Sequence, residues 1–235
     1  MLILALETTT VVSGVAIATE ARLLSEVTAA RLTHSETLQA HVAMALEMAG
    51  VSKSEVEAVA VSLGPGSFTG LRIGLAAGKG MAYAWGVPLV GVPTLAALAA
   101  QFPVPGAQVA ALMDAQKGNA YMALYEWREE GSVEVLPVTV CPLAEVLAKC
   151  GAVEGPVILT GDVAQKRLAQ RGDLPANVCL APSDMIMPRA AAVARLGLRE
   201  LAAGRTGSVM DMAPVYVRRS EAEVLWEARQ KKAAP

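Results

Sequence analysis

The chain has 235 residues, of which 54% are hydrophobic and 18% charged, and its net charge is −2. This composition supports a large buried core and excludes an intrinsically disordered chain. A net charge close to zero argues against a free-standing RNA-binding protein, which would need a basic surface. The three cysteines lack a paired spacing, so we expect reduced thiols rather than a zinc site or a disulfide framework.

Residues 80–113 contain no charged side chain. A membrane-spanning helix needs about 20 consecutive apolar residues. Glycines and prolines interrupt this stretch every few residues, which favours buried strands and turns around a helix. The apolar N-terminus lacks the basic region of a signal peptide and reads as a first strand. We therefore expect a cytoplasmic protein without a membrane span.

The first half of the chain predicts an α/β lobe, residues 1–102. Apolar runs bounded by turn residues indicate strands, and apolar residues at helical spacing indicate helices. The expected strands cover residues 2–6, 11–18, 23–28, 56–63 and 88–92, and the expected helices cover residues 33–49, 69–85 and a stretch from 94. Thr33 and Glu36 fit a capping box at the start of the first helix.

A joint rich in proline and glycine, residues 101–107, leads to a second predicted lobe, residues 103–235. Its expected strands cover residues 109–113, 119–125, 133–140 and 157–160, with one helix after residue 162 and a last helix over 189–203. Hairpin-type strands followed by alternating helices and strands occur in both halves. This pattern predicts two similar α/β lobes with mixed sheets flanked by helices.

The most informative motif is the glycine turn Gly64-Pro65-Gly66-Ser67, between a buried strand and a helix. Backbone N–H groups in such a turn and the N-terminus of the next helix favour an anion. Ser67 or Thr69 is suited to cap that helix. The lysine of a P-loop is missing. A tight connection without any ligand explains the same residues, and the sequence leaves both readings open.

The helix after this turn carries Gly70, Gly74 and Gly78 on one face, bordered by Met81. Each glycine inside a helix costs about 1 kcal/mol relative to alanine, so close approach of another backbone is expected to compensate. That backbone belongs either to the chain's own sheet or to a partner subunit. Spacing alone does not decide between the two.

No catalytic or metal-binding constellation is predicted. His34 and His41 lie about 10 Å apart along one helix, too far to share a zinc ion. Ser67 does not fit the Gly-x-Ser-x-Gly turn of hydrolases.

Several segments together resemble the TsaB (YeaZ) family, an accessory family of tRNA threonylcarbamoyladenosine synthesis. The resemblance runs over nearly the whole chain and is most specific in the glycine turn. It is carried by Leu4–Thr8, Thr33–Leu38, Gly64–Gly74, Gly86–Val92, Asp114–Gly118 with Tyr121, and Pro214–Arg218.

The resemblance implies a two-lobed actin-like (ribonuclease H-like) ATPase fold in a non-catalytic scaffold. It implies three associations: with a catalytic TsaD-type paralogue, with a TsaE-type ATPase, and with a second copy when the chain is alone. Contact with tRNA, and any bound ATP or ADP, would belong to the assembled complex. The first two helices would meet the partner, near Leu38, Val42, Gly70, Gly74, Gly78 and Met81. The basic residues between 218 and 232 are either a tRNA contact or a solvated helix.

The resemblance has an internal test at Pro93–Leu98. The catalytic paralogue, once described as a glycoprotease, carries Asn-His-Leu-Glu-Gly-His after a comparable Gly-Val, and its two histidines bind a metal. Here the two histidine positions are Thr94 and Leu98, neither of which can replace imidazole on a metal. This argues against a metallopeptidase.

An ATP-dependent kinase or ATPase is the stronger rival. It would hold phosphate through Glu7, Thr8, Thr9, Gly64, Gly66 and Ser67, with a second phosphate loop at Gly161-Asp162. The family usually has aspartate at the position of Glu7, so this acid is one methylene longer.

Overall fold

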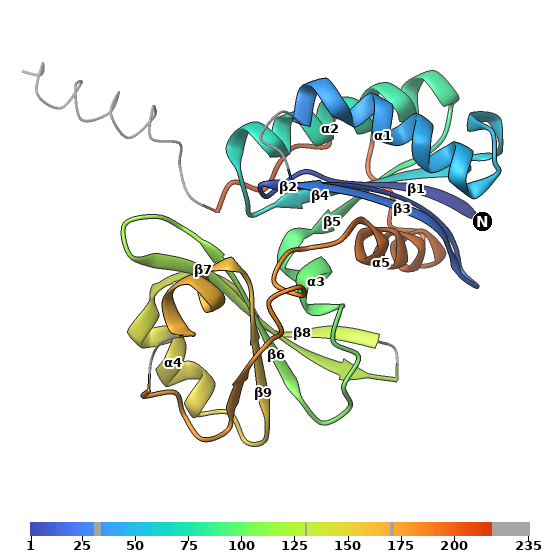
Figure 1. The fold of residues 1–235 in the computed structure, drawn as a ribbon. Helices are drawn as coiled ribbons and strands as arrows, with labels where there is room; N and C mark the ends of the chain where they lie inside the picture. Colours follow the sequence, from blue (N-terminus) through green and yellow to red (C-terminus); the bar gives the residue numbers. More distant parts are fainter. Residues whose placement is uncertain (31–33, 130, 170–171, 218–235) are drawn as a thin grey trace, which may run out of the picture.

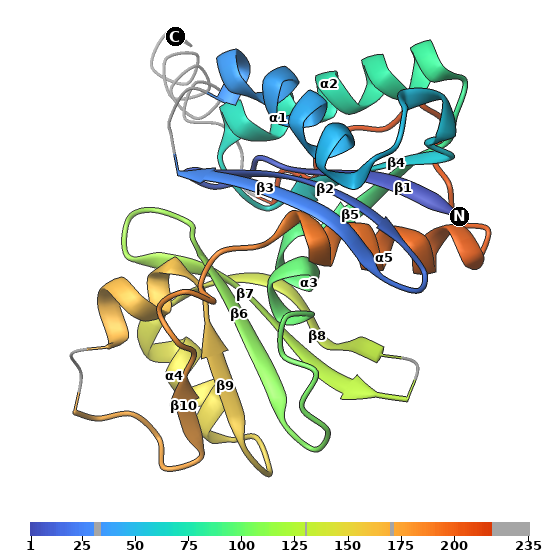
Figure 2. The same cartoon turned by 45° about the vertical axis from the view of Figure 1, so that its right-hand side comes forward.

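The computed structural model describes residues 1–30, 34–129, 131–169 and 172–217 and arranges them in two lobes (Figures 1 and 2). Thr33, the predicted cap of the first helix, lies outside these residues. So do the basic residues between 218 and 232.

A five-stranded sheet in the order β3-β2-β1-β4-β5 forms the centre of the first lobe. Its strands are β1 (Leu2–Glu7), β2 (Val12–Thr19), β3 (Leu23–Ala30), β4 (Ala58–Gly64) and β5 (Leu89–Pro93). The hairpin strands β1, β2 and β3 pair antiparallel, whereas β1, β4 and β5 are parallel to one another because helices connect them.

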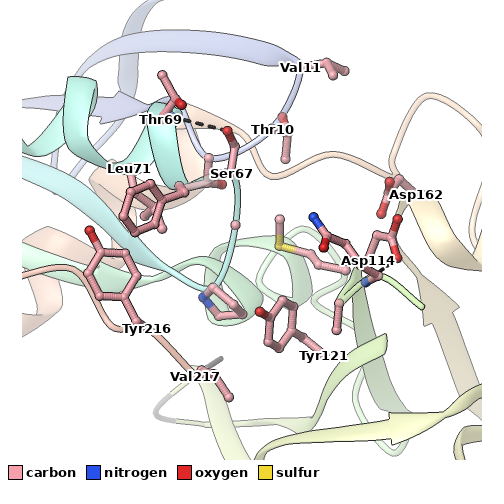
Figure 3. Close-up of a pocket in the computed structure, with 18 of the residues that line it drawn as sticks. Thr10, Val11, Ser67, Thr69, Leu71, Asp114, Tyr121, Asp162, Tyr216 and Val217 are labelled. Atoms are coloured by element: carbon pink, nitrogen blue, oxygen red, sulfur yellow. Dashed lines mark hydrogen bonds between the residues drawn. The ribbon is translucent and has the colours of Figure 1, made fainter. Parts of the chain in front are cut away.

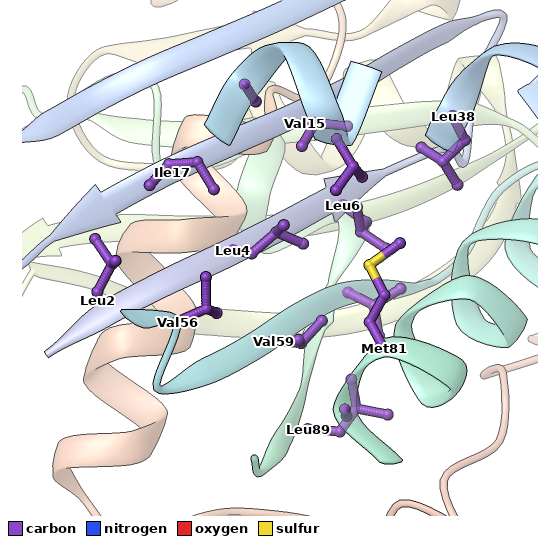
Figure 4. Close-up of a cluster of buried hydrophobic side chains, with 14 of the residues drawn as sticks. Leu2, Leu4, Leu6, Val15, Ile17, Leu38, Val56, Val59, Met81 and Leu89 are labelled. Carbon is purple, nitrogen blue, oxygen red and sulfur yellow. The ribbon is translucent and has the colours of Figure 1, made fainter. Parts of the chain in front are cut away.

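Helices cover both faces of this sheet, since the central strands β1 and β4 are apolar on both sides. The helices α1 (His34–Ala49) and α2 (Phe68–Trp85) lie side by side on one face (Figures 1 and 2). Leu4, Leu6 and Val59 point toward them and form one core cluster with Leu38 and Met81 (Figure 4). The short helix η1 (Lys53–Glu55) precedes β4.

The opposite face is covered by α5 (Ala190–Ala202), which comes from the end of the chain. Ile3, Ala5 and Ala60 pack against it. A Cβ atom on Gly197 would lie 2.8 Å from the Cβ of Ala60, so the helix sits very close to the sheet. Its place in the sequence predicts that this helix belongs to the second lobe, residues 103–235. The small residues on this face of the sheet allow it to return to the first.

The second lobe repeats the same sheet topology, in the order β10-β9-β6-β7-β8. Its elements are β6 (Gln108–Asp114), β7 (Asn119–Arg128), β8 (Gly131–Pro142), α4 (Leu143–Gly151), β9 (Val157–Thr160), η2 (Ala164–Leu168) and β10 (Val178–Leu180). In each lobe the first strand pairs antiparallel with the second and parallel with the fourth. The predicted pair of similar halves with mixed sheets is confirmed.

The two lobes meet around α3 (Thr94–Ala99). Its Ala97 packs with the core of the first sheet, whereas Leu95 and Leu98 pack with Val109 and Tyr125 of the second. A C-terminal strap, residues 205–217, then runs back over the first lobe. Gly207 bridges to Leu89 of the edge strand β5.

Candidate functional site between the lobes

A cleft of about 990 Å³ lies between the lobes (Figure 3). The first lobe contributes the turn after β1, with Thr9, and the start of α2, with Ser67. The second contributes Asp114 from the β6–β7 turn and Asp162, which follows β9. Tyr216 of the C-terminal strap lines it as well. Such a cleft between two lobes is a common place for a ligand.

Glu7 lies inside the first lobe, where it is 1% exposed, and does not line the cleft. Its carboxylate accepts hydrogen bonds from the Thr9 N–H at 2.7 Å, from the Thr9 hydroxyl at 2.5 Å and from the Ser62 hydroxyl. Burial raises its pKa, and these hydrogen bonds oppose that rise. The carboxylate therefore holds the hairpin turn in shape and does not face a ligand.

The glycine turn packs directly against this hairpin turn. The Ser67 N–H donates to the Thr9 carbonyl at 2.7 Å, and a Cβ atom on Gly66 would lie 2.6 Å from the Thr9 Cβ. The Thr8 hydroxyl donates to the Gly70 carbonyl at 2.7 Å. The two turns that carry the predicted phosphate contacts therefore touch each other.

The C-terminal strap covers the glycine turn from another side. The Val215 N–H donates to the Leu63 carbonyl at 2.7 Å. A Cβ atom on Gly64, whose φ is +117°, would lie 2.8 Å from the Val215 carbonyl oxygen. This position therefore needs glycine for both its backbone conformation and its close contact.

An aromatic cluster anchors the strap at the mouth of the cleft. The rings of Phe68 and Tyr216 lie 4.9 Å apart, and the Arg72 guanidinium lies 3.9 Å above the Phe68 ring. Arg72 also donates to the Tyr216 hydroxyl at 3.2 Å.

The structure divides the six predicted phosphate contacts into two groups. Thr9, Gly66 and Ser67 line the cleft, whereas Glu7, Thr8 and Gly64 do not. Ser67 caps α2 by accepting a hydrogen bond from the Gly70 N–H at 3.3 Å, as its position predicted. An anion site at the glycine turn requires backbone N–H groups that are open to a ligand. Here the Ser67 N–H is hydrogen-bonded to the Thr9 carbonyl, and the C-terminal strap covers Gly64.

The second lobe contributes charged side chains to the cleft. Asp162 pairs with Lys166 at 3.0 Å, and Asp114 lies 3.6 Å from Arg167. The Asp114 carboxylate also accepts the Gln116 N–H at 2.8 Å. Both aspartates lie in segments that stand out in the sequence, but no local pattern predicts that they share one cleft, because β6 and β9 become neighbours only in the folded sheet.

The glycine stripe of α2 faces the interior of the first lobe. A Cβ atom would lie 2.0 Å from the Thr8 carbonyl oxygen at Gly70 and 2.2 Å from the Thr8 hydroxyl at Gly74. At Gly78 it would lie 3.4 Å from Leu89. Packing within the chain therefore explains the stripe, which corrects its assignment to a partner interface.

The other predicted interface residues are buried too. Leu38, Val42 and Met81 belong to the core between α1, α2 and the sheet (Figure 4). Apolar residues at helical spacing mark the side of a helix that is buried, and the nearest apolar surface here is the chain's own sheet. These side chains contact the sheet and cannot also present a surface to a partner.

The opposite sides of α1 and α2 form an exposed surface that we call the outer helical face (Met44, Met48, Ala76, Gly80, Tyr83 and Ala84). Met48 is 61% and Tyr83 73% exposed. Ala76, Gly80 and Ala84 recur every four residues on α2, and all three are exposed. The predicted interface omits this second small-residue stripe, although its spacing is visible in the sequence.

The two positions that carry metal-binding histidines in the paralogue are fully buried. The Thr94 hydroxyl accepts the Gly64 N–H at 3.1 Å, and Leu98 lies in the core between α3 and the second sheet. Among the described residues there is no cluster of three or more histidine, cysteine, aspartate or glutamate side chains suited to a metal. In the same part of the chain, every helix is too short or too polar to cross a membrane.

Two lobes with the same mixed-sheet topology around a cleft define the actin-like ATPase class of fold. The (R)-2-hydroxyglutaryl-CoA dehydratase component A of Acidaminococcus fermentans has this arrangement. Its structure matches with a TM-score of 0.53 at 11% sequence identity and covers 86% of this chain and 99% of its own. At that identity the likeness concerns the fold alone.

Comparison of sequences is more specific. A family model described as tRNA N6-adenosine threonylcarbamoyltransferase (TsaD) matches residues 25–226. The tRNA threonylcarbamoyladenosine biosynthesis protein TsaB of Bacillus subtilis is 28% identical over 233 residues, which is 98% of this chain and 100% of its own length. The structure of YeaZ from Pseudomonas aeruginosa is 28% identical, has a TM-score of 0.74 and covers 92% of this chain and 100% of its own. The chain belongs to the TsaB (YeaZ) family.

Proposed function

We propose that this protein is a non-catalytic subunit in the synthesis of threonylcarbamoyladenosine in tRNA. Its similarity to a TsaB biosynthesis protein over nearly the whole chain supports the pathway. The family model that it matches is described by the catalytic activity, which supports a paralogue of the threonylcarbamoyltransferase as its partner. The chemistry would then belong to that TsaD-type partner, with a TsaE-type ATPase as a third component.

The observation that carries the non-catalytic role is the contact between the two turns of the first lobe. The Ser67 N–H, which an anion would use, donates to the Thr9 carbonyl. Glu7, the acid suited to position a magnesium ion, is buried under three hydrogen bonds. A chain that performed phosphate chemistry would keep these groups accessible to the ligand.

We propose that the outer helical face is the partner-binding surface. Exposed methionine and tyrosine side chains are typical of interface centres. The small residues Ala76, Gly80 and Ala84 allow the backbone of another helix to approach closely. A second copy of this chain would compete for the same face, so the homodimer is expected when the paralogue is absent.

ATP binding by the isolated chain remains the alternative, because the cleft of about 990 Å³ has room for a nucleotide. In the proposed role, ATP or ADP binds to the assembled complex and not to this chain alone. A titration of the purified chain with ATP and magnesium separates the two: saturable binding would favour the enzyme.

The decisive experiment measures threonylcarbamoyl transfer to tRNA. The purified chain, the TsaD-type paralogue and the two together are each combined with the TsaE-type ATPase. We expect modification only when both are present. Transfer by this chain without the paralogue, or full transfer without this chain, would overturn the proposal.

The partner surface is tested with two matched substitutions on exposed helix positions. Ala76→Arg places a charge in the outer helical face, and Ala148→Arg places the same charge on α4 of the second lobe. We expect Ala76→Arg to weaken association with the paralogue at least tenfold, about 1.4 kcal/mol. Ala148→Arg should leave association unchanged. Equal affinities of the two variants, with unfolding midpoints like that of the original chain, would place the interface elsewhere.

A further inference from the structure

A second, smaller pocket of about 220 Å³ lies at the C-terminal end of α3, where α5 passes the adjoining ends of β7 and β8. Both views place the adjoining ends of β7 and β8 below α5 (Figures 1 and 2). Its walls come from the end of α3 at Ala100, from Trp127 and Gly131 around the turn, and from Arg195 and Arg199 of α5. The pocket is therefore built from both lobes.

Two arginine side chains face this pocket from one side of α5. The Arg195 guanidinium lies 5.7 Å from the centre of the Trp127 ring and donates a hydrogen bond to the Ala100 carbonyl. The Arg199 guanidinium lies against the backbone of Gly131, where an added Cβ atom would be 2.4 Å from its Nη1. The aromatic ring and the turn thus hold both groups in place.

Among the described residues, no ion pair balances the charge of these two arginines. Like charges four residues apart on a helix repel each other. Desolvation, and then the charge of Arg199, lower the pKa of Arg195. Arg189 and Arg205, at the two ends of the same helix, pair with Glu26 and Glu200.

Among the described residues, by contrast, no ion pair involves Arg195 or Arg199. The exposed Glu129 also lines the pocket, and no ion pair between described residues involves it.

We propose that this pocket binds a phosphate group, held between the Arg195 and Arg199 guanidinium groups over the face of Trp127. Guanidinium groups bind phosphate through charge-assisted, often bidentate hydrogen bonds. A dianion here neutralises the repulsion between the two arginines. Since the pocket walls come from α3, α5 and the β7–β8 turn, the bound anion also fixes the lobes relative to each other.

The test is a titration of the full chain with inorganic phosphate at constant ionic strength, followed by tryptophan fluorescence. We expect a saturable change that is lost in Trp127→Phe. Arg199→Gln should weaken phosphate binding at least tenfold, because one charge-assisted hydrogen-bonding group is removed. Glu129→Gln should tighten binding about twofold, because a negative charge at the rim is removed.

Arg128→Gln is the matched control. Arg128 lies next to Trp127 but pairs with Glu126 and is absent from the pocket wall, so its loss changes the net charge equally. The proposal is overturned if phosphate produces no saturable fluorescence change. It is also overturned if Arg199→Gln and Arg128→Gln lower the phosphate affinity equally. Competition by glycerol 3-phosphate assigns the site to phosphomonoesters, and lack of competition assigns it to the free oxyanion.

Discussion

The hairpin turn between β1 and β2 and the hairpin turn between β6 and β7 occupy the same place in two lobes of the same topology. Each begins with an acidic residue at the end of its first strand. In the first turn the carboxylate of Glu7 is buried among hydroxyl and amide donors. In the second, Asp114 is 44% exposed and faces the cleft.

The difference in exposure between the two carboxylates comes from the elements that pack on each turn. The first is covered by α2, whose glycines let the helix backbone approach Thr8. Beside the second, only the side chain of Arg167 from the short helix η2 approaches the carboxylate among the described ion pairs, at 3.6 Å, and the turn backbone adopts positive φ at Gln116, Lys117 and Gly118. The same topology thus holds one carboxylate as part of the core and leaves the other accessible. Each of the following substitutions tests this contrast.

The largest effect is expected from Gly70→Ala. Its Cβ atom would lie 2.0 Å from the Thr8 carbonyl oxygen, so α2 or the turn must shift. We expect the free energy of unfolding to fall by about 3 kcal/mol. Gly80→Ala on the same helix has open space around it and should raise stability by roughly 0.5–1 kcal/mol. Urea unfolding measures both, and an unchanged free energy of unfolding for Gly70→Ala would mean that α2 does not pack closely on the hairpin turn.

Glu7→Gln should have the next largest effect. At pH about 4.5 we expect a loss of about 1–3 kcal/mol, because the amide nitrogen cannot accept the hydrogen bonds that the carboxyl oxygens accept. The pKa of Glu7 is raised above 4.5 in the folded chain, so folding favours the protonated form. Its contribution is therefore complete below the unfolded-state pKa and declines as pH rises through the folded-state pKa.

The difference in stability between the original chain and Glu7→Gln should accordingly shrink from pH 4.5 upward. Urea unfolding at a series of pH values measures it. A difference that grows with pH would show instead that the hydrogen bonds lower the pKa more than burial raises it.

Asp114→Asn should have the smallest effect. The side chain is exposed and its ion pair with Arg167 is long, at 3.6 Å. We expect a change of at most about 0.5 kcal/mol in the free energy of unfolding, measured by urea unfolding. A loss comparable to that of Glu7→Gln would mean that the second turn is as tightly built as the first.

Most of the fold could be predicted from the sequence, because in long helices and strands the spacing of apolar residues indicates the type of element. The paired hairpins and the helix α2 lie close to their predicted ranges. The helix α4 was missed although Leu143, Val146, Leu147 and Cys150 have helical spacing. The strand β10 has three residues, too few to show any period.

The site was harder to predict because its geometry depends on contacts between distant residues. The sequence named Glu7 and the glycine turn, but the side on which the carboxylate lies depends on Ser62, far along the chain. The contact of Val215 with Leu63 and Gly64 joins residues about 150 positions apart. No local pattern indicates that the strap would cover the turn. The spacing of the glycines on α2 likewise predicts a close contact with another backbone, but it does not indicate which backbone that is.

The return of α5 to the first sheet has a consequence for the order in which the protein is made. A ribosome releases β1 to β5 long before residues 190–202. One face of the sheet, with Ile3, Ala5 and Ala60, is therefore not buried by α5 until almost the whole chain has been synthesised. Domains generally fold as they emerge during translation. Here the second lobe can complete its sheet first, and the lobe that starts the chain is the last to be closed.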